Sequence, residues 1–201
     1  GRDYYARLLT QLAAKAAPDI MQVGDDAVPM FVGKGAFVPL DDLLKAEKFD
    51  PSIYLPGLLD PGKFDGKQYL LPKDYSPLAV YYNKKLFDDA KVAYPKADWT
   101  WDEFLETAKK LTRDTTGDGK TDVWGVQLPA AWTTGFEYWV AAAGGSLISK
   151  DGKTFTGYMD SPEVIRAVQF YADLYNKHKV APPPADMSAF GGGNPEFSTG
   201  K

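Results

Sequence analysis

Short apolar segments that alternate with amphipathic helical segments restrict the fold of this 201-residue chain more than any other feature. Residues 19–23 (DIMQV) are short and apolar, follow a helical pattern, and predict a buried parallel strand. Residues 123–129 (VWGVQLP) are also typical of a strand, and residues 76–83 (SPLAVYYN) are extended and apolar on both faces. Helices that alternate with such strands predict the α/β class.

The helical segments carry recognisable start and stop signals. Thr100 and Glu103 have the spacing of a capping box, which predicts a helix within residues 98–112. Ser161 followed by Pro162 predicts the start of another. A helix over 133–145 is predicted to end at two glycines, and 147–157 to form a hairpin with an Asp-Gly turn. Two apolar stripes have helical spacing: Tyr4, Tyr5, Leu8, Leu9 and Leu12, and Val164, Ile165, Val168, Tyr171 and Leu174.

Composition excludes several classes of function. A formal net charge of −4 argues against a nucleic-acid partner, which usually requires a basic patch. The absence of cysteine excludes disulfides and thiolate chemistry. His178 is the only histidine, and its position near a helix C-terminus between two lysines favours a solvated residue rather than a catalytic one. The sequence therefore gives no positive support for catalysis, although a glycosidase-type carboxylate pair stays open because Asp and Glu are numerous.

Residues 114–125 (DTTGDGKTDVWG) resemble the loop of an EF-hand. Oxygen-bearing side chains fall at positions 1, 3, 5 and 9, a glycine at position 6 allows the sharp turn, and position 7 is a lysine. Position 12 is a glycine where the motif needs a bidentate glutamate, and a strand-like segment follows instead of a helix. Two interpretations remain, a turn that satisfies its own backbone and a weak structural calcium site. The candidate ligands are Asp114, Thr116, Asp118, Lys120 and Asp122.

Aromatic residues gather beside polar loops. Trp132 precedes the helix that contains Trp139, Tyr75 adjoins Asp74, and Asp25 and Asp26 follow the first predicted strand. Loops at the carboxyl ends of parallel strands commonly bind ligands. Aromatic faces and carboxylates suit a sugar, which offers apolar C–H groups and hydroxyls. The competing interpretation is that these aromatics form the core. Phe136, Val140 and Ala143 have the spacing of one buried helix face, and we prefer this interpretation for Phe136.

With these residues in view, the chain resembles the carbohydrate-type extracellular solute-binding proteins of ABC importers, relatives of maltose-binding protein. The resemblance covers nearly the whole sequence. It rests on the order and spacing of segments 4–23, 33–44, 64–87, 100–112, 117–125 and 139–174.

The resemblance implies a periplasmic-binding-protein-like two-lobe fold of type II, incomplete here. Residues 1–75 would form part of the N-terminal lobe, 76–83 the first hinge strand, and 84–201 part of the C-terminal lobe. Such a protein is a monomeric non-enzyme that captures a sugar or oligosaccharide between its lobes and delivers it to a membrane ABC permease. It needs no cofactor, with calcium optional. The implied ligand-binding residues are Asp25, Asp26, Asp74, Tyr75, Ser76, Trp132 and Trp139.

The family pattern also implies residues beyond both ends of this sequence. A first strand–helix unit would precede residue 1, and a strand and further pocket residues would follow residue 201. The implied location is extracellular or periplasmic, with a lipid anchor in the preceding segment. The rival interpretations are a secreted glycoside-active enzyme that uses a carboxylate pair and a calcium-stabilised interaction module.

Overall fold

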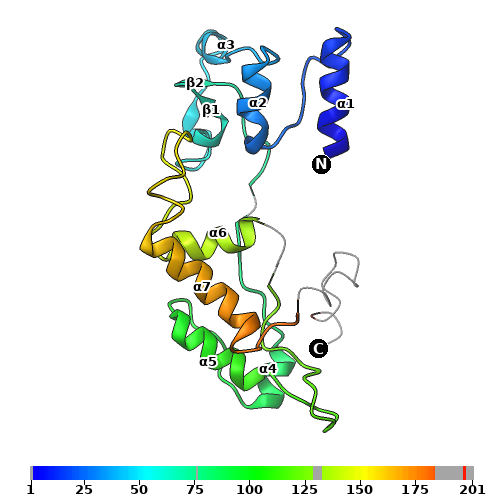
Figure 1. Ribbon diagram of the computed structural model, residues 1–201. Helices are drawn as coiled ribbons and strands as arrows, with labels where there is room; N and C mark the ends of the chain where they lie inside the picture. Colours follow the sequence, from blue (N-terminus) through cyan, green and yellow to red (C-terminus); the bar gives the residue numbers. More distant parts are fainter. Residues whose placement is uncertain (1, 76, 129–132, 184–196, 198–201) are drawn as a thin grey trace. The chain divides into compact units, whose positions relative to one another are not determined.

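The computed structural model describes residues 2–75, 77–128, 133–183 and 197, without the side chains of residues 2, 133 and 134. The chain forms two compact units, Gly1–Pro77 (unit 1) and Leu78–Lys201 (unit 2). Within the described residues the secondary structure is mainly helical (Figure 1). None of the helices in that part of the chain has both the length and the apolarity to cross a membrane. The predicted hinge over 76–83 stays a prediction.

Unit 1 is built around a small apolar core between its first two α-helices. Leu8, Ala27 and Phe31 are buried, and the rings of Tyr5 and Phe31 meet edge to face with centroids 5.9 Å apart. The stripe that contains Leu8 therefore faces the core, as its spacing predicts. The elements are α1 (Arg2–Ala13), η1 (Asp25–Ala27), α2 (Val28–Gly33), α3 (Asp41–Ala46), η2 (Pro51–Ile53), η3 (Asp60–Gly62), β1 (Lys63–Phe64) and β2 (Lys67–Gln68).

The strands β1 and β2 form an antiparallel hairpin in which Lys63 pairs with Gln68 and Phe64 with Lys67. The two loop residues, Asp65 and Gly66, have φ angles of +46° and +78°. Positive φ at both positions is typical of a type I′ turn, and Asp-Gly is among its preferred sequences.

The described part of unit 2 contains four α-helices, and start signals predicted from the sequence are found at two of them. The Thr100 side chain accepts a hydrogen bond from the Glu103 N–H, and the Glu103 carboxylate accepts one from the Thr100 N–H, so the predicted capping box is confirmed. Ser161 caps the last helix through the Val164 N–H. The elements are α4 (Lys84–Ala90), α5 (Trp101–Leu111), α6 (Thr133–Ala142) and α7 (Pro162–Asn176).

The core of unit 2 gathers around Trp139, which is 7% exposed. Its ring lies 5.3 Å from Phe104 of α5 and 5.3 Å from Phe170 of α7, centroid to centroid. Helices α6 and α7 lie against each other (Figure 1). Tyr175 of α7 donates a hydrogen bond to the Leu128 carbonyl at 2.8 Å, and burial raises the pKa of Tyr175. The core interpretation of the α6 stripe is confirmed, since Val140 is buried and residues 136 and 143 pack against the same cluster.

Two predicted strands are wrong. Residues 19–23 form no strand, and Ile20 is 90% exposed. Residues 123–128 contribute one isolated antiparallel bridge, Arg113 to Val123, and one hydrogen bond from the Val126 N–H to the Val180 carbonyl. A strand requires a neighbour that completes its ladder of hydrogen bonds. Within the described ranges neither segment takes part in a continuous ladder.

Two predicted details in residues 147–180 also need correction. The Asp-Gly turn forms, with the Ser149 N–H donating to the Thr154 carbonyl, but no strands flank it. In the α7 stripe, Ile165 and Val168 are 58% and 43% exposed, whereas Ala167 is fully buried. The buried face of α7 therefore consists of Val164, Ala167 and Leu174, which belong to the same core cluster as Trp139.

We predict that Trp139→Ala lowers the free energy of unfolding by about 3–5 kcal/mol, because it leaves a cavity among the aromatic rings of three helices. The matched control is Tyr138→Ala, a neighbouring aromatic residue that is 52% exposed. We expect that control to cost about 0.5 kcal/mol or less. Urea unfolding followed by circular dichroism measures both. Equal losses of unfolding free energy in Trp139→Ala and Tyr138→Ala would contradict a core role for Trp139.

Candidate functional site

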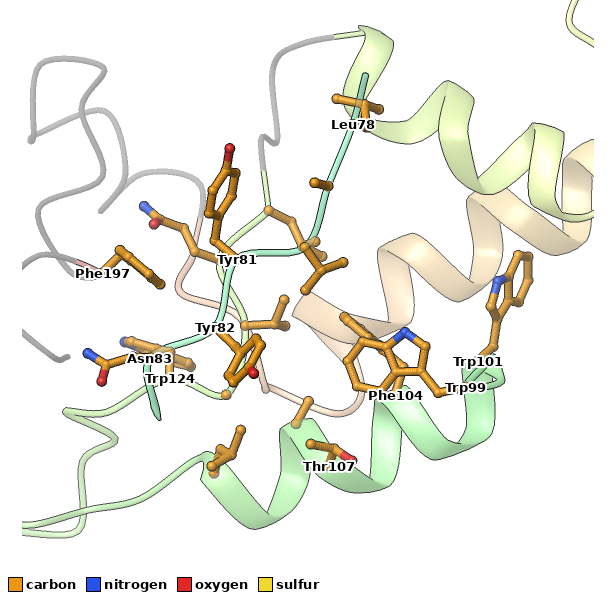
Figure 2. A pocket seen from close by; sticks show the side chains of 18 of the residues that line it. Leu78, Tyr81, Tyr82, Asn83, Trp99, Trp101, Phe104, Thr107, Trp124 and Phe197 are labelled. Carbon is orange, nitrogen blue, oxygen red and sulfur yellow. The ribbon is translucent and has the colours of Figure 1, made fainter. Parts of the chain in front are cut away.

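Unit 2 contains an open pocket with a volume of about 900 Å³. The extended segment that begins at Leu78 runs along it, and side chains from the start of α5, including Phe104, line it together with residues 124–128 (Figure 2). Aromatic side chains supply much of the wall: Tyr81, Tyr82, Phe87, Trp99, Trp101, Phe104, Trp124, Tyr138, Trp139 and Phe197.

The polar groups of this pocket are few and partly engaged elsewhere. The Asn83 side chain caps α4 through the Leu86 N–H, and the Thr100 hydroxyl is part of the capping box of α5. No Asp, Glu, Lys or Arg is among its described lining residues. The pocket can therefore offer ring faces to a ligand but not the charged hydrogen-bonding groups that orient a sugar.

The carboxylates predicted to bind ligand belong to unit 1. Asp25 and Asp26 are exposed at the start of the η1 turn, and Asp25 accepts a hydrogen bond from the Asp26 N–H at 3.1 Å. Asp74 is exposed and pairs with Lys73 at 2.9 Å, a surface pair of little energetic weight. Tyr75 beside it is 55% exposed. The carboxylates are thus accessible to a ligand from solvent.

The structure brings some predicted site residues together but not all of them. Asp25 adjoins Asp26, and Asp74 adjoins Tyr75, but no hydrogen bond or ion pair joins the two pairs in the described part of unit 1. Trp139 lines the pocket of unit 2 while serving in its core. The two other predicted residues, Ser76 and Trp132, lie outside the described residues. The ligand roles of all seven residues stay predictions.

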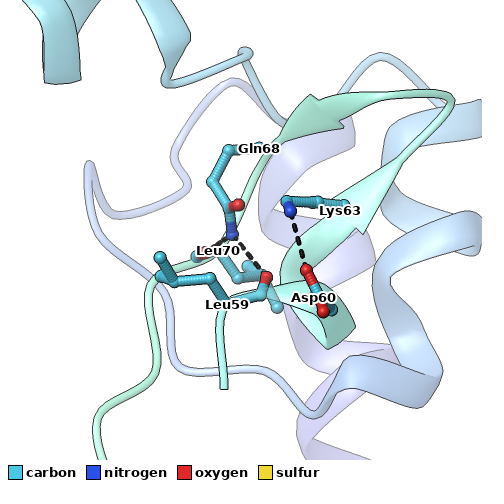
Figure 3. Close-up of polar contacts among 5 residues, drawn as sticks. All are labelled: Leu59, Asp60, Lys63, Gln68 and Leu70. Atoms are coloured by element: carbon cyan, nitrogen blue, oxygen red, sulfur yellow. Dashed lines mark hydrogen bonds and ion pairs between the residues drawn. The ribbon is translucent and has the colours of Figure 1, made fainter. Parts of the chain in front are cut away.

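Gln68 fixes the segment that leads to Asp74 and Tyr75, a role that the sequence did not suggest. It is 7% exposed, and its side-chain amide donates to the carbonyls of Leu59, at 3.0 Å, and Leu70 (Figure 3). Its backbone N–H donates to the Asp41 carboxylate at 3.2 Å. Gln68 thus uses its buried side-chain amide and its backbone N–H to tie together segments that are far apart in sequence.

The loop over 114–125 satisfies its own backbone. The Asp114 carboxylate accepts hydrogen bonds from the N–H groups of Gly117 and Gly119 at 2.6 and 2.7 Å, and these bonds hold the pKa of Asp114 below its usual value. Hydrogen bonds from Thr115 lower the pKa of Asp122 in the same way. Among the described residues no group of three or more Asp, Glu or His converges as a metal site. The calcium site stays a prediction.

The sequence matches the family described as bacterial extracellular solute-binding protein over residues 1–201. The chain belongs to this family. Among solved structures, an ABC substrate-binding protein from Listeria monocytogenes in complex with cycloalternan is 36% identical, with a TM-score of 0.80 over 99% of this chain and 49% of that one. The solute-binding protein therefore has the predicted periplasmic-binding-protein-like fold.

Two curated relatives are similar at the sequence level. The diacetylchitobiose-binding protein DasA of Streptomyces coelicolor is 32% identical over 166 residues, which are 82% of this chain and 36% of DasA. The sn-glycerol-3-phosphate-binding periplasmic protein UgpB of Brucella abortus is 32% identical over 169 residues, 80% of this chain and 38% of UgpB. This solute-binding protein thus spans less than half the length of either relative.

We predict that Asp114→Asn lowers the melting temperature of the solute-binding protein at pH 7 and that the difference disappears in acid. The pKa of Asp114 is lower in the folded chain than its ordinary value of 3.8, so its stabilising effect is present above that value and is lost as pH falls through the folded pKa. Thermal melts of the wild type and of Asp114→Asn between pH 7 and pH 3 measure the difference in melting temperature. A difference that does not change with pH would contradict the charge-assisted role of Asp114.

We predict that Gln68→Leu destabilises unit 1 by about 1–3 kcal/mol, because two buried carbonyls lose their donor. Gln169→Leu is the matched control, since the Gln169 amide is exposed and donates to Asp173 on the surface of α7. Urea unfolding should give a clearly lower free energy of unfolding for Gln68→Leu than for Gln169→Leu. Similar midpoints would mean that the Gln68 amide is replaceable.

Proposed function

We propose that this solute-binding protein captures a sugar or oligosaccharide and delivers it to a membrane ABC permease. The observation that carries the proposal is the Listeria relative, which was solved with cycloalternan and aligns with 99% of this chain at 36% identity. The curated relative that binds diacetylchitobiose supports the same class of ligand. The chain spans about half of the first and about a third of the second, so the activity of the whole protein is inferred from them.

The chemistry of unit 1 favours a neutral sugar over a phosphorylated solute such as the one named for UgpB. Asp25 and Asp26 are adjacent exposed carboxylates that accept hydrogen bonds from hydroxyl groups. The same pair would repel a phosphate, particularly in a protein with a net charge of −4. Asp74 extends the acidic character of the unit.

We further propose that the protein acts as a monomer outside the cytoplasmic membrane, with a lipid anchor in a segment that precedes this sequence. We expect it to release its sugar unchanged. The family is one of binding proteins, and the relatives above are named for the molecules that they bind. An enzyme would instead use two carboxylates about 5–9.5 Å apart across the glycosidic bond.

The test is a titration of mono-, di- and oligosaccharides, with sn-glycerol-3-phosphate included, followed through tryptophan emission. We expect a saturable change with one class of sugar, since Trp99 and Trp124 are only half-buried at the pocket. Asp25→Asn should weaken binding about tenfold through the loss of a charge-assisted hydrogen bond. Chromatography of the sugar after long incubation distinguishes a binder from a hydrolase. Saturation by the phosphate alone, or cleavage of the sugar, would overturn the proposal.

A further inference from the structure

One hydrogen bond joins helix α1 to the loop that carries the paired carboxylates. The Gly24 N–H donates to the hydroxyl oxygen of Tyr5 at 2.9 Å, across 19 residues of sequence. Gly24 is the residue directly before the η1 turn, and its carbonyl accepts the first hydrogen bond of that turn from Ala27 at 3.1 Å. The two bonds of Gly24 thus hold the backbone from which the side chains of Asp25 and Asp26 project.

Gly24 is selected for space and not for an unusual backbone conformation. Its φ of −74° and ψ of 156° are accessible to any residue. A Cβ at this position would collide with the Asp26 carboxylate and would lie 3.2 Å from the Tyr5 hydroxyl oxygen. The carboxylate of Asp26 therefore lies back over the Gly24 backbone, close to the point where Tyr5 holds the loop.

Tyr5 is itself held in place by packing. Its ring meets Phe31, which is fully buried, edge to face at 5.9 Å, and lies 5.7 Å from the ring of Tyr4. The phenol thus combines an apolar body in the core with a polar tip at the loop. Tyr4 is adjacent to Tyr5 in the same helix, but within the described part of the chain its hydroxyl makes no hydrogen bond to the loop.

We infer that Tyr5 is a positioning residue for ligand binding, which fixes the Asp25 and Asp26 carboxylates by holding the Gly24 N–H. The inference rests on the proposed function, in which these carboxylates accept hydrogen bonds from sugar hydroxyls. A carboxylate pair that is oriented before the ligand arrives loses less conformational freedom on binding, so pre-organisation raises affinity. Tyr5 touches no ligand and acts through the loop.

The first experiment measures amide hydrogen exchange of residues 22–28 in the full protein. Tyr5→Phe removes the hydroxyl and keeps the ring, and we expect the Gly24 amide to exchange about fivefold faster because it loses its acceptor. Tyr4→Phe, the matched control, should leave this exchange unchanged. Unaltered exchange in Tyr5→Phe would overturn the inference whether or not any sugar binds.

The second experiment measures the dissociation constant of the sugar that saturates the wild-type protein. We expect Tyr5→Phe to raise it about five- to tenfold and Tyr4→Phe to change it less than about twofold. Gly24→Ala keeps the Tyr5 side chain but crowds its hydroxyl and the Asp26 carboxylate, so it should weaken binding similarly. This variant decides the matter if Tyr5→Phe perturbs α1. Faster exchange with unchanged affinity would overturn the inference. A wild-type protein that binds no sugar would overturn the proposed function, and the exchange experiment would still decide whether Tyr5 fixes the loop.

Discussion

The contact of Trp139 with aromatic rings from two other helices is the interaction on which the order of unit 2 depends. Helix α6 contributes Trp139, α5 contributes Trp101 and Phe104, and α7 contributes Phe170. Few backbone hydrogen bonds connect these helices, because the described part of unit 2 contains one isolated bridge and no sheet. Side-chain packing must therefore supply the tertiary stability that ladder hydrogen bonds provide elsewhere.

The balance between local and long-range interactions explains which elements the sequence predicted. The capping box at Thr100 and the Ser161 cap each involve residues three positions apart, and both form as their spacing predicts. Residues 19–23 and 123–128 have strand-like composition, but a strand also requires a partner that composition does not reveal. Periodicity placed α7 correctly, and Val164, Tyr171 and Leu174 of the predicted stripe lie in or against the core. Ile165 and Val168 are exposed, because the tertiary contacts of a helix and not its periodicity alone determine which residues become buried.

The distinction between local and long-range interactions also applies to the candidate site. Asp25 and Asp26 could be proposed from the sequence because adjacent acidic residues follow an apolar segment, and the comparison with solute-binding proteins agrees with the kind of protein that this suggested. The anchoring roles of Tyr5 and Gln68 could not be predicted. Their hydrogen bonds span 19 residues in one case and up to 27 in the other, and neither Tyr nor Gln is distinctive where it occurs. The sequence shows only a Gln two residues after an Asp-Gly pair, which is a weak signal because most Gln residues are exposed.

The two units differ in the chemistry that they can offer a sugar. A bound hydroxyl that is removed from water needs a hydrogen-bonding partner, and leaving it without one costs about 1–3 kcal/mol. The aromatic pocket of unit 2 supplies ring faces, but its Asn83 and Thr100 side chains already cap helices. Aromatic stacking alone would bind many sugars with little discrimination, since all pyranose rings have apolar faces. In the proposed function, Asp25 and Asp26 of unit 1 contribute discrimination, because directional acceptors reject a sugar with a misplaced hydroxyl. In the proposed function, the hydrogen bond that holds the loop of these two carboxylates would therefore affect specificity as well as affinity, through a Tyr5 hydroxyl on α1 that touches no ligand.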